Sequence, residues 1–126
     1  MKKNFLIAGA IFGALAVVFG ALGAHALKEI LSAESLDSFE TAVRYQMYHA
    51  LLLVVLSNYK ELHSKFILYA TISGILFFSF SIYLLSLRHL FDLDGLKVLG
   101  PITPIGGLLL VLVWLSILAK AIKIKK

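Results

Sequence analysis

Histidine and serine residues in apolar surroundings are the side chains of this sequence that could do chemistry. His25 lies in GALGAHAL, His49 in RYQMYHALLL, and Ser79 and Ser81 in FSFSIYLL. An imidazole can relay protons or ligate a metal, and a serine beside a histidine can act as a nucleophile. The chemistries to weigh are therefore metal binding, proton transfer and hydrolysis.

None of the three has a supporting pattern. Two imidazoles are too few for a typical closed zinc site, Glu40 would be about two helical turns from His49, and the chain has no cysteine. Neither the H-E-x-x-H spacing nor a nucleophile elbow occurs. We expect hydrogen-bonded structural histidines, with no catalytic residue, metal or cofactor. A metal site, a titrating proton site and an intramembrane enzyme using His49 stay as alternatives.

The composition places these residues in a membrane. Hydrophobic residues make up 60% of the 126 residues and charged residues only 15%, and the mean hydropathy is +0.94. A soluble domain carries about 25% charged residues. This chain has too few charges to cover a water-facing surface, so we expect an integral membrane protein.

Four uncharged windows predict the spans. Three have 22 to 24 residues, and a helix needs about 20 to cross a hydrocarbon core of about 30 Å. The second window, 45–59, is shorter, but the apolar turn before it extends it, with Arg44 reaching the headgroups. The sequence predicts one all-α domain over 1–126, an integral membrane four-helix transmembrane bundle. Its spans are about 5–27, 43–59, 66–87 and 102–121, with an outer loop and amphipathic turn at 28–42.

The N-terminal run also resembles a secretory signal, with Ala24-His25-Ala26 as the cleavage site. A signal has an apolar region of about 7 to 15 residues, whereas this run has about 20. We expect it to stay as the first span.

The charges predict the orientation. With four spans, the termini and the 60–65 loop share one side, which carries eight lysines: Lys2, Lys3, Lys60, Lys65, Lys120, Lys123, Lys125 and Lys126. The other side has four basic residues, Lys28, Arg44, Arg88 and Lys97, and six of the seven acidic residues. The positive-inside bias then puts both termini in the cytoplasm, in a multi-pass protein of the cell (inner) membrane. The basic excess indicates topology and contact with membrane lipids, and no nucleic-acid partner.

Up-down connectivity brings the polar residues of all four spans to one leaflet. On the second span, Thr41, Arg44, Tyr45, Tyr48 and His49 share an arc of about 140°. Polar side chains are costly against lipid, so we expect these residues to point into the bundle and pair there. The candidate polar cluster or binding site is His25, Arg44, Tyr45, Gln46, Tyr48, His49, Ser79, Ser81, Tyr83 and Thr103.

Small residues and prolines predict helix contacts and kinks, at Gly9, Gly13, Gly20, Gly23, Pro101, Pro104, Gly106 and Gly107. The Gly9-x3-Gly13 pair lets another helix approach closely, from the same chain or a second copy. Thr103 could cap a helix starting at Pro104, which leaves 98–103 non-helical. Asp37 could likewise cap the helix of the second span, with Glu40 completing a capping box.

Four motifs, GALGAHAL, YQMYHALLL, FSFSIYLL and GPITPIGG, resemble the YgdD/YwdK-like family of small bacterial membrane proteins. The likeness covers nearly the whole chain, with the motifs in the same order. It implies a four-helix inner-membrane protein from a family with no assigned activity. Phe80 departs from the family's pattern, in which a glycine stands within F-S-G-S.

The sequence leaves three functional hypotheses. The first is a structural or accessory membrane protein, whose polar cluster fixes helix packing and docks a lipid, a second copy or a membrane-protein partner. The second is a subunit of an oligomeric transporter or channel, or a small-molecule or lipid-binding membrane protein. The inner half of the bundle is nearly all apolar, so the sequence shows no polar path for a transported solute. The third is the intramembrane enzyme.

Overall fold

The computed structural model describes residues 1–125 and is helical throughout, with no strand in that range. Lys126, one of the eight lysines of the charge count, lies outside the described residues. The long helices are α1 (Lys2–Ala24), α2 (Ala33–Leu56), α3 (Lys65–Ile75) and α5 (Ile102–Ile122). Helix α3 continues through the π-helical segment η2 (Leu76–Phe80) into α4 (Ser81–Leu87). A short 3₁₀ helix, η1 (Lys60–Leu62), precedes α3, and two more, η3 (Arg88–Phe91) and η4 (Asp94–Leu99), follow α4.

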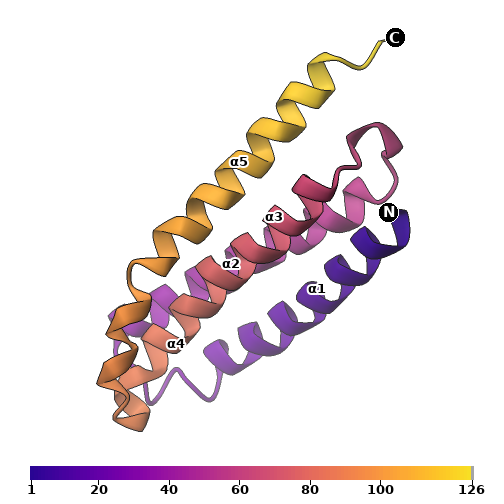
Figure 1. Cartoon of the computed structure of the whole chain (residues 1–126). Coiled ribbons are helices and arrows are strands. Elements are labelled where there is room, and N and C mark those ends of the chain that lie inside the picture. Colours follow the sequence, from indigo (N-terminus) through magenta and orange to yellow (C-terminus); the bar gives the residue numbers. More distant parts are fainter. Residues whose placement is uncertain (126) are drawn as a thin grey trace.

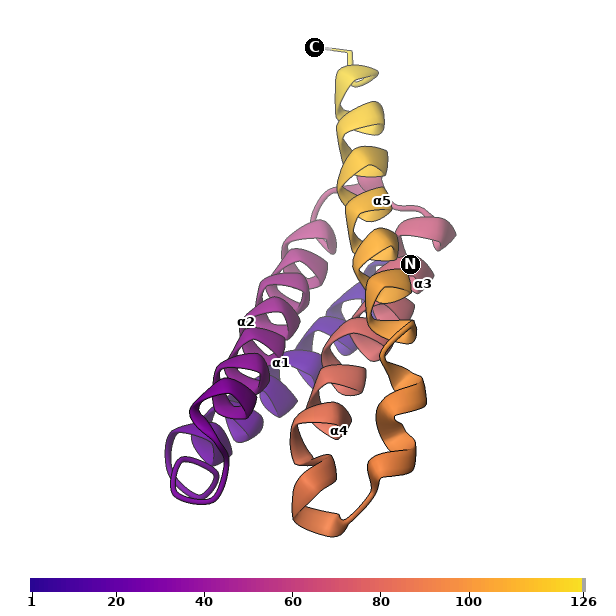
Figure 2. The same cartoon turned by 90° about the vertical axis from the view of Figure 1, so that its left-hand side faces the viewer.

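The helices form an up-down bundle (Figures 1 and 2). Both termini and the turn between α2 and α3 lie at one end, here called the terminal end. The connection from α1 to α2 and residues 88–101 lie at the other, here called the distal end. Connectivity therefore places the termini on the same side, as the charge pattern requires.

Three helical stretches are long and apolar enough to cross a membrane: Lys2–Ala24, Lys65–Phe91 and Asp94–Ile122. Helix α2 is not among them because its first half carries Glu34, Asp37, Glu40 and Arg44. It nevertheless runs antiparallel to α1 and returns the chain to the terminal end (Figure 1). The all-α membrane fold is confirmed.

Two predicted helix starts were wrong. Helix α2 begins at Ala33, because the Ser32 side chain accepts the Ser35 N–H at 3.1 Å; Asp37 lies inside the helix. Helix α5 begins at Ile102 after Pro101, so Thr103 lies within the first turn and does not cap it. Pro104 is tolerated there because first-turn N–H groups have no intrahelical partner. Residues 94–99, part of which was expected to be non-helical, form η4.

The glycine stripe of α1 packs on α2 of the same chain. A Cβ added at Gly9 would lie 2.8 Å from the Ala50 carbonyl oxygen and 2.7 Å from the Val54 side chain, so only glycine allows this approach. Gly13, Gly20 and Gly23 face the same helix. The small-residue motif therefore joins helices within one chain.

Helix α5 crosses the third span at its π-helical segment. A Cβ on Gly106 would collide with the backbone of Phe77 and Phe78, whereas one on Gly107 would lie 3.6 Å from the Phe78 ring. On the next turn inward, Gly74 receives the side chain of Leu110. Backbone contact at Gly106 fixes where α5 sits on the bundle.

Phe80 fills the space between α1 and the third span. Its ring centroid lies 6.4 Å from Phe12, 6.0 Å from Phe19 and 5.5 Å from Tyr83, in edge-to-face arrangements. Phe80 therefore adds aromatic packing against α1.

Candidate functional site

Gln46 is the centre of the buried polar network. Its side chain is 0% exposed. The amide Nε2 donates to the carbonyl oxygen of Phe12 at 2.8 Å, and the amide oxygen accepts the hydroxyl of Tyr83 at 2.7 Å. One side chain of α2 thus joins α1 and α4 through hydrogen bonds shielded from water and lipid.

The serines predicted for the cluster make two further links. Ser79 Oγ donates to the Ala42 carbonyl oxygen at 2.8 Å, joining η2 to α2. Ser81 Oγ lies 2.5 Å from the Phe77 carbonyl oxygen and 2.6 Å from the Thr103 hydroxyl. Its single proton goes to the carbonyl, so Thr103 donates to Ser81 and ties α5 to α4.

His49 has both ring nitrogens engaged. Nδ1 lies 2.7 Å from the Tyr45 carbonyl oxygen, and Nε2 lies 3.2 Å from the indole Nε1 of Trp114. A carbonyl only accepts and an indole N–H only donates, so His49 is the neutral Nδ1–H tautomer. The ring is only 4% exposed. It offers no free lone pair for a metal, and Trp114 of α5 is its hydrogen-bond donor.

Four predicted cluster residues do not face the interior. Tyr45 is 43% exposed and Tyr48 is 55% exposed. Exposed Arg44 bonds only Thr41 of its own helix, and His25 lies exposed just after α1. The buried face of α2 instead follows Phe39, Ala42, Gln46, His49, Ala50 and Leu53. The inward prediction failed because α2 packs Val43, Ala50 and Val54 against the glycines of α1, and this rotation turns the face with the two tyrosines outward.

The terminal half of the bundle is apolar inside. Its largest fully buried side chains include Phe5, Leu53, Ile67 and Val113. The buried hydroxyls at this level bond to carbonyls of their own helices: Thr71 to Ile67 at 2.6 Å and Ser57 to Val54 at 2.7 Å. The hydrogen bonds between helices therefore reach the middle of the bundle, at Phe12, His49 and Trp114, and the core beyond them is apolar.

A separate cavity of about 650 Å³ opens at the distal end. We call it the distal cup; it lies between residues 32–41 of α2, residues 82–89, and residues 100–104. Glu34 and Asp37 line one wall, and Arg88 and His89 another. Sequence reasoning missed it: these residues entered only as charges on the outer side, and nothing in their spacing brings them together.

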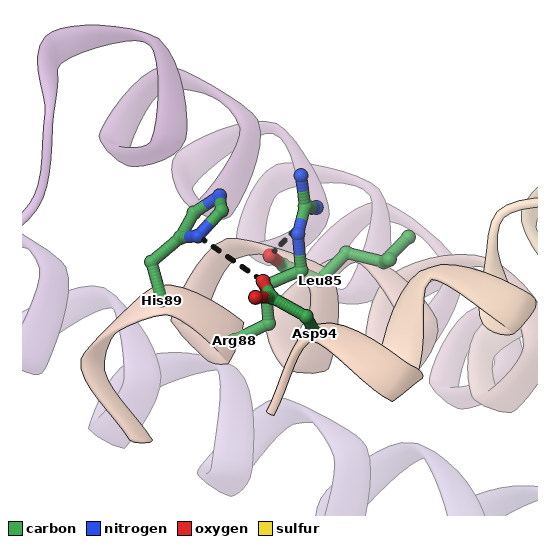
Figure 3. Close-up of polar contacts among 4 residues, drawn as sticks. All are labelled: Leu85, Arg88, His89 and Asp94. Atoms are coloured by element: carbon green, nitrogen blue, oxygen red, sulfur yellow. Dashed lines mark hydrogen bonds and ion pairs between the residues drawn. The ribbon is translucent and has the colours of Figure 1, made fainter. Parts of the chain in front are cut away.

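The basic residues of the distal cup have different surroundings (Figure 3). His89 lies on the rim, with Nδ1 3.6 Å from the carboxylate of exposed Asp94. Arg88 donates to the Leu85 carbonyl oxygen at 3.2 Å, and its guanidinium points away from Asp94. In residues 1–125, no three His, Asp or Glu side chains are grouped to hold a metal ion.

The chain is similar to known membrane proteins over almost its full length. Residues 19–107 match the family described as "Protein of unknown function (DUF423)". A UPF0382 membrane protein of Staphylococcus saprophyticus is 38% identical over 125 residues, covering 97% of this chain and 99% of the relative. The UPF0382 membrane protein YwdK of Bacillus subtilis is 37% identical over 126 residues, covering 96% and 98%.

No solved structure matches the chain. The family assignment therefore depends on the sequence matches, which confirm the resemblance to YwdK-like proteins. With 89 of 126 residues matched by the family and relatives aligned from end to end, the chain belongs to the DUF423 family of membrane proteins.

Proposed function

We propose that this protein is a non-catalytic accessory component of the cytoplasmic membrane, acting through what it binds at its surface and distal end. The observation that carries the proposal is the closure of the interior network. Gln46, Ser79, Ser81, Tyr83 and His49 have polar atoms hydrogen-bonded to one another, to neighbouring helices or to carbonyls of their own helix. These residues hold the bundle in one arrangement and leave little for a substrate to engage.

Two other functions receive less support. An enzyme using His49 needs a free nitrogen at a reacting atom, and both nitrogens are occupied. A channel needs a polar path across the membrane, and the terminal half is lined by apolar side chains. Each function would require the bundle to rearrange.

The proposed orientation puts both termini in the cytoplasm. Charge supports it, because the terminal end carries seven lysines of the described residues and the distal end six of the seven acidic residues. The distal cup then opens at the outer leaflet. Membrane lipids, a second copy or another membrane protein are the partners that the exposed apolar helix surfaces fit.

Flux through reconstituted protein tests the proposal. Liposomes containing the full chain should show the same proton and potassium leak as protein-free liposomes. The matched variant is Gln46→Leu/Tyr83→Phe, which removes the hydrogen bonds of Gln46 to Phe12 and Tyr83 without adding charge. A leak in the wild type that the variant changes at equal protein density would refute the accessory function in favour of transport.

A further inference from the structure

The distal cup presents opposite charges on facing walls without pairing them. Glu34 and Asp37 project from the first turns of α2, and Arg88 begins η3. Within residues 1–125 the His89–Asp94 contact on the rim is the one ion pair closer than 4.0 Å. The carboxylates of Glu34 and Asp37 are therefore more than 4.0 Å from the guanidinium nitrogens of Arg88, although all three residues line the same cavity.

Arg88 is incompletely bonded. One terminal nitrogen donates to the Leu85 carbonyl oxygen (Figure 3). The Nε atom is buried and has no hydrogen-bond partner in the described chain. An unpaired buried donor on a cation is costly, which leaves the Arg88 side chain incompletely satisfied. Arg88 also lines the cup, so its guanidinium can pair with an anionic oxygen bound there.

The position of the cup favours a lipid over a soluble solute. Its charged residues lie at the distal end of membrane-crossing helices, the level of the lipid headgroups. Ile82, Leu85 and Pro104 give the cup an apolar side. One and two turns further along α2 from Thr41, the exposed rings of Tyr45 and Tyr48 offer a surface for acyl chains.

We propose that the distal cup binds the headgroup of a phospholipid that carries both a phosphate and a primary ammonium, as in an ethanolamine phospholipid. The phosphate accepts hydrogen bonds from Arg88, and the ammonium donates to Glu34 and Asp37. A ligand with one negative and one positive group would pair with both walls, which explains why the charged side chains of the two walls do not pair with each other. The inference deepens the proposed accessory function, which it takes as its basis, by naming the class of bound partner.

The chemistry of the lining separates this headgroup from the common alternatives. A choline headgroup has no N–H to donate and is bound by aromatic cages, and the cup contains no Phe, Tyr or Trp. A glycerol headgroup leaves the lipid with net negative charge and no cation for the two carboxylates. The ethanolamine headgroup satisfies both walls.

Native mass spectrometry of the full-length protein in detergent tests this inference. The probes are ethanolamine, glycerol and choline phospholipids with the same acyl chains. We expect the wild type to retain the ethanolamine lipid about tenfold better than the glycerol lipid. Glu34→Gln/Asp37→Asn should reduce that preference to about twofold or less, and Arg88→Gln should weaken retention of both lipids.

Matched controls change charge at the same end outside the cup: Glu29→Gln/Asp92→Asn for the carboxylates and Lys97→Gln for Arg88. These should bind like the wild type. Equal retention of the three lipids by the wild type, or equal losses in the control variants, would overturn the inference. The carboxylate variants keep the test valid if Arg88→Gln does not fold.

A final arm separates lipid from soluble ligand. Glycerophosphoethanolamine has the same charges without acyl chains, and we expect it to bind at least about tenfold more weakly than the lipid. Equally tight binding would overturn the lipid assignment. If the ethanolamine lipid is not retained, the lipid inference fails but the flux measurement still tests the accessory function. If the liposomes show a proton or potassium flux, the accessory function fails but the measured lipid retention is unchanged.

Discussion

The hydroxyl of Tyr83 donates to the side-chain oxygen of Gln46 across 2.7 Å, joining residues 37 apart in sequence. The same amide holds the Phe12 carbonyl oxygen with its nitrogen. Three of the helices therefore meet at one side chain, and the consequence for stability can be measured.

A double-mutant cycle should show coupling between these two residues. Gln46→Leu leaves the buried Tyr83 hydroxyl without its acceptor, and Tyr83→Phe leaves the Gln46 oxygen without its donor. Coupling between polar residues in membrane helices is about 0.6 kcal/mol and reaches about 1.7 kcal/mol, so we expect a value in that range. Reversible unfolding in mixed micelles measures it.

The control for the cycle is Ser116→Ala, since Ser116 bonds only to the Leu112 carbonyl oxygen of its own helix. It should show no coupling to Tyr83→Phe. Strictly additive effects of Gln46→Leu and Tyr83→Phe would contradict the geometry.

Two adjacent glycines should differ sharply in tolerance. Gly106→Ala puts a methyl into the backbone of Phe77 and Phe78, whereas Gly107→Ala makes an ordinary contact at 3.6 Å. Overpacking of this kind costs about 1–3 kcal/mol, and we expect a lower thermal midpoint for Gly106→Ala alone. Similar midpoints for the two variants would show that α5 is not held by this backbone contact.

The hydrogen bonds of His49 predict its tautomer. Nitrogen-15 NMR of the protein in bilayers should show the His49 proton on Nδ1 and an unprotonated Nε2, because Nε2 accepts the Trp114 indole N–H. Trp114→Phe should shift the Nε2 resonance and leave the Nδ1 proton in place. A proton found on Nε2 in the wild type would be incompatible with the Trp114 contact.

Cysteine labelling can determine the orientation, because the chain has no cysteine of its own. Glu29→Cys lies at the distal end and Lys60→Cys in the turn at the terminal end, both exposed. In intact cells stripped of outer barriers, a membrane-impermeant maleimide should label Glu29→Cys, and should label Lys60→Cys only after lysis. The reverse pattern would place the termini outside.

Phe80→Ala tests the aromatic packing between α1 and the third span. The substitution leaves a void beside Phe12, Phe19 and Tyr83. Removing a buried phenylalanine costs about 3–5 kcal/mol, and Phe80 is only partly buried, so we expect the lower end of that range. Phe91→Ala, on the exposed distal end, is the control and should leave the unfolding midpoint unchanged.

The sequence could predict the membrane fold because its signals are local. Uncharged windows long enough to cross a bilayer mark the spans, and the glycines of α1 mark a close contact. The rotation of each helix is not local. Helix α2 was expected to bury its Tyr45 and Tyr48 face because polar residues avoid lipid, yet aromatic hydroxyl side chains are accommodated at the membrane interface.

The spacing of Ala42, Gln46 and Ala50, every four residues, was the signal for the buried face of α2. Ala50 lies opposite Gly9 and Gly13 of α1, so close packing at this point outweighs polarity in setting the rotation of α2. The distal cup had no such signal. Its walls come from residues about 50 apart in sequence, and their distance depends on the tertiary arrangement of three segments.

The π-helical segment at Leu76–Phe80 makes the third span two helices with different rotational settings. Residues before it present Thr71 and Gly74 to the bundle, Ser79 is buried within it, and residues after it present Ser81, Tyr83 and Ser86. The wide turn holds one residue more than an α-helical turn, and this extra residue sets how the buried faces of the two halves are aligned. Deleting one residue from α3 while the wide turn persisted would rotate the two parts of the span by about 100° relative to each other, taking Tyr83 from Gln46 and Arg88 from the distal cup.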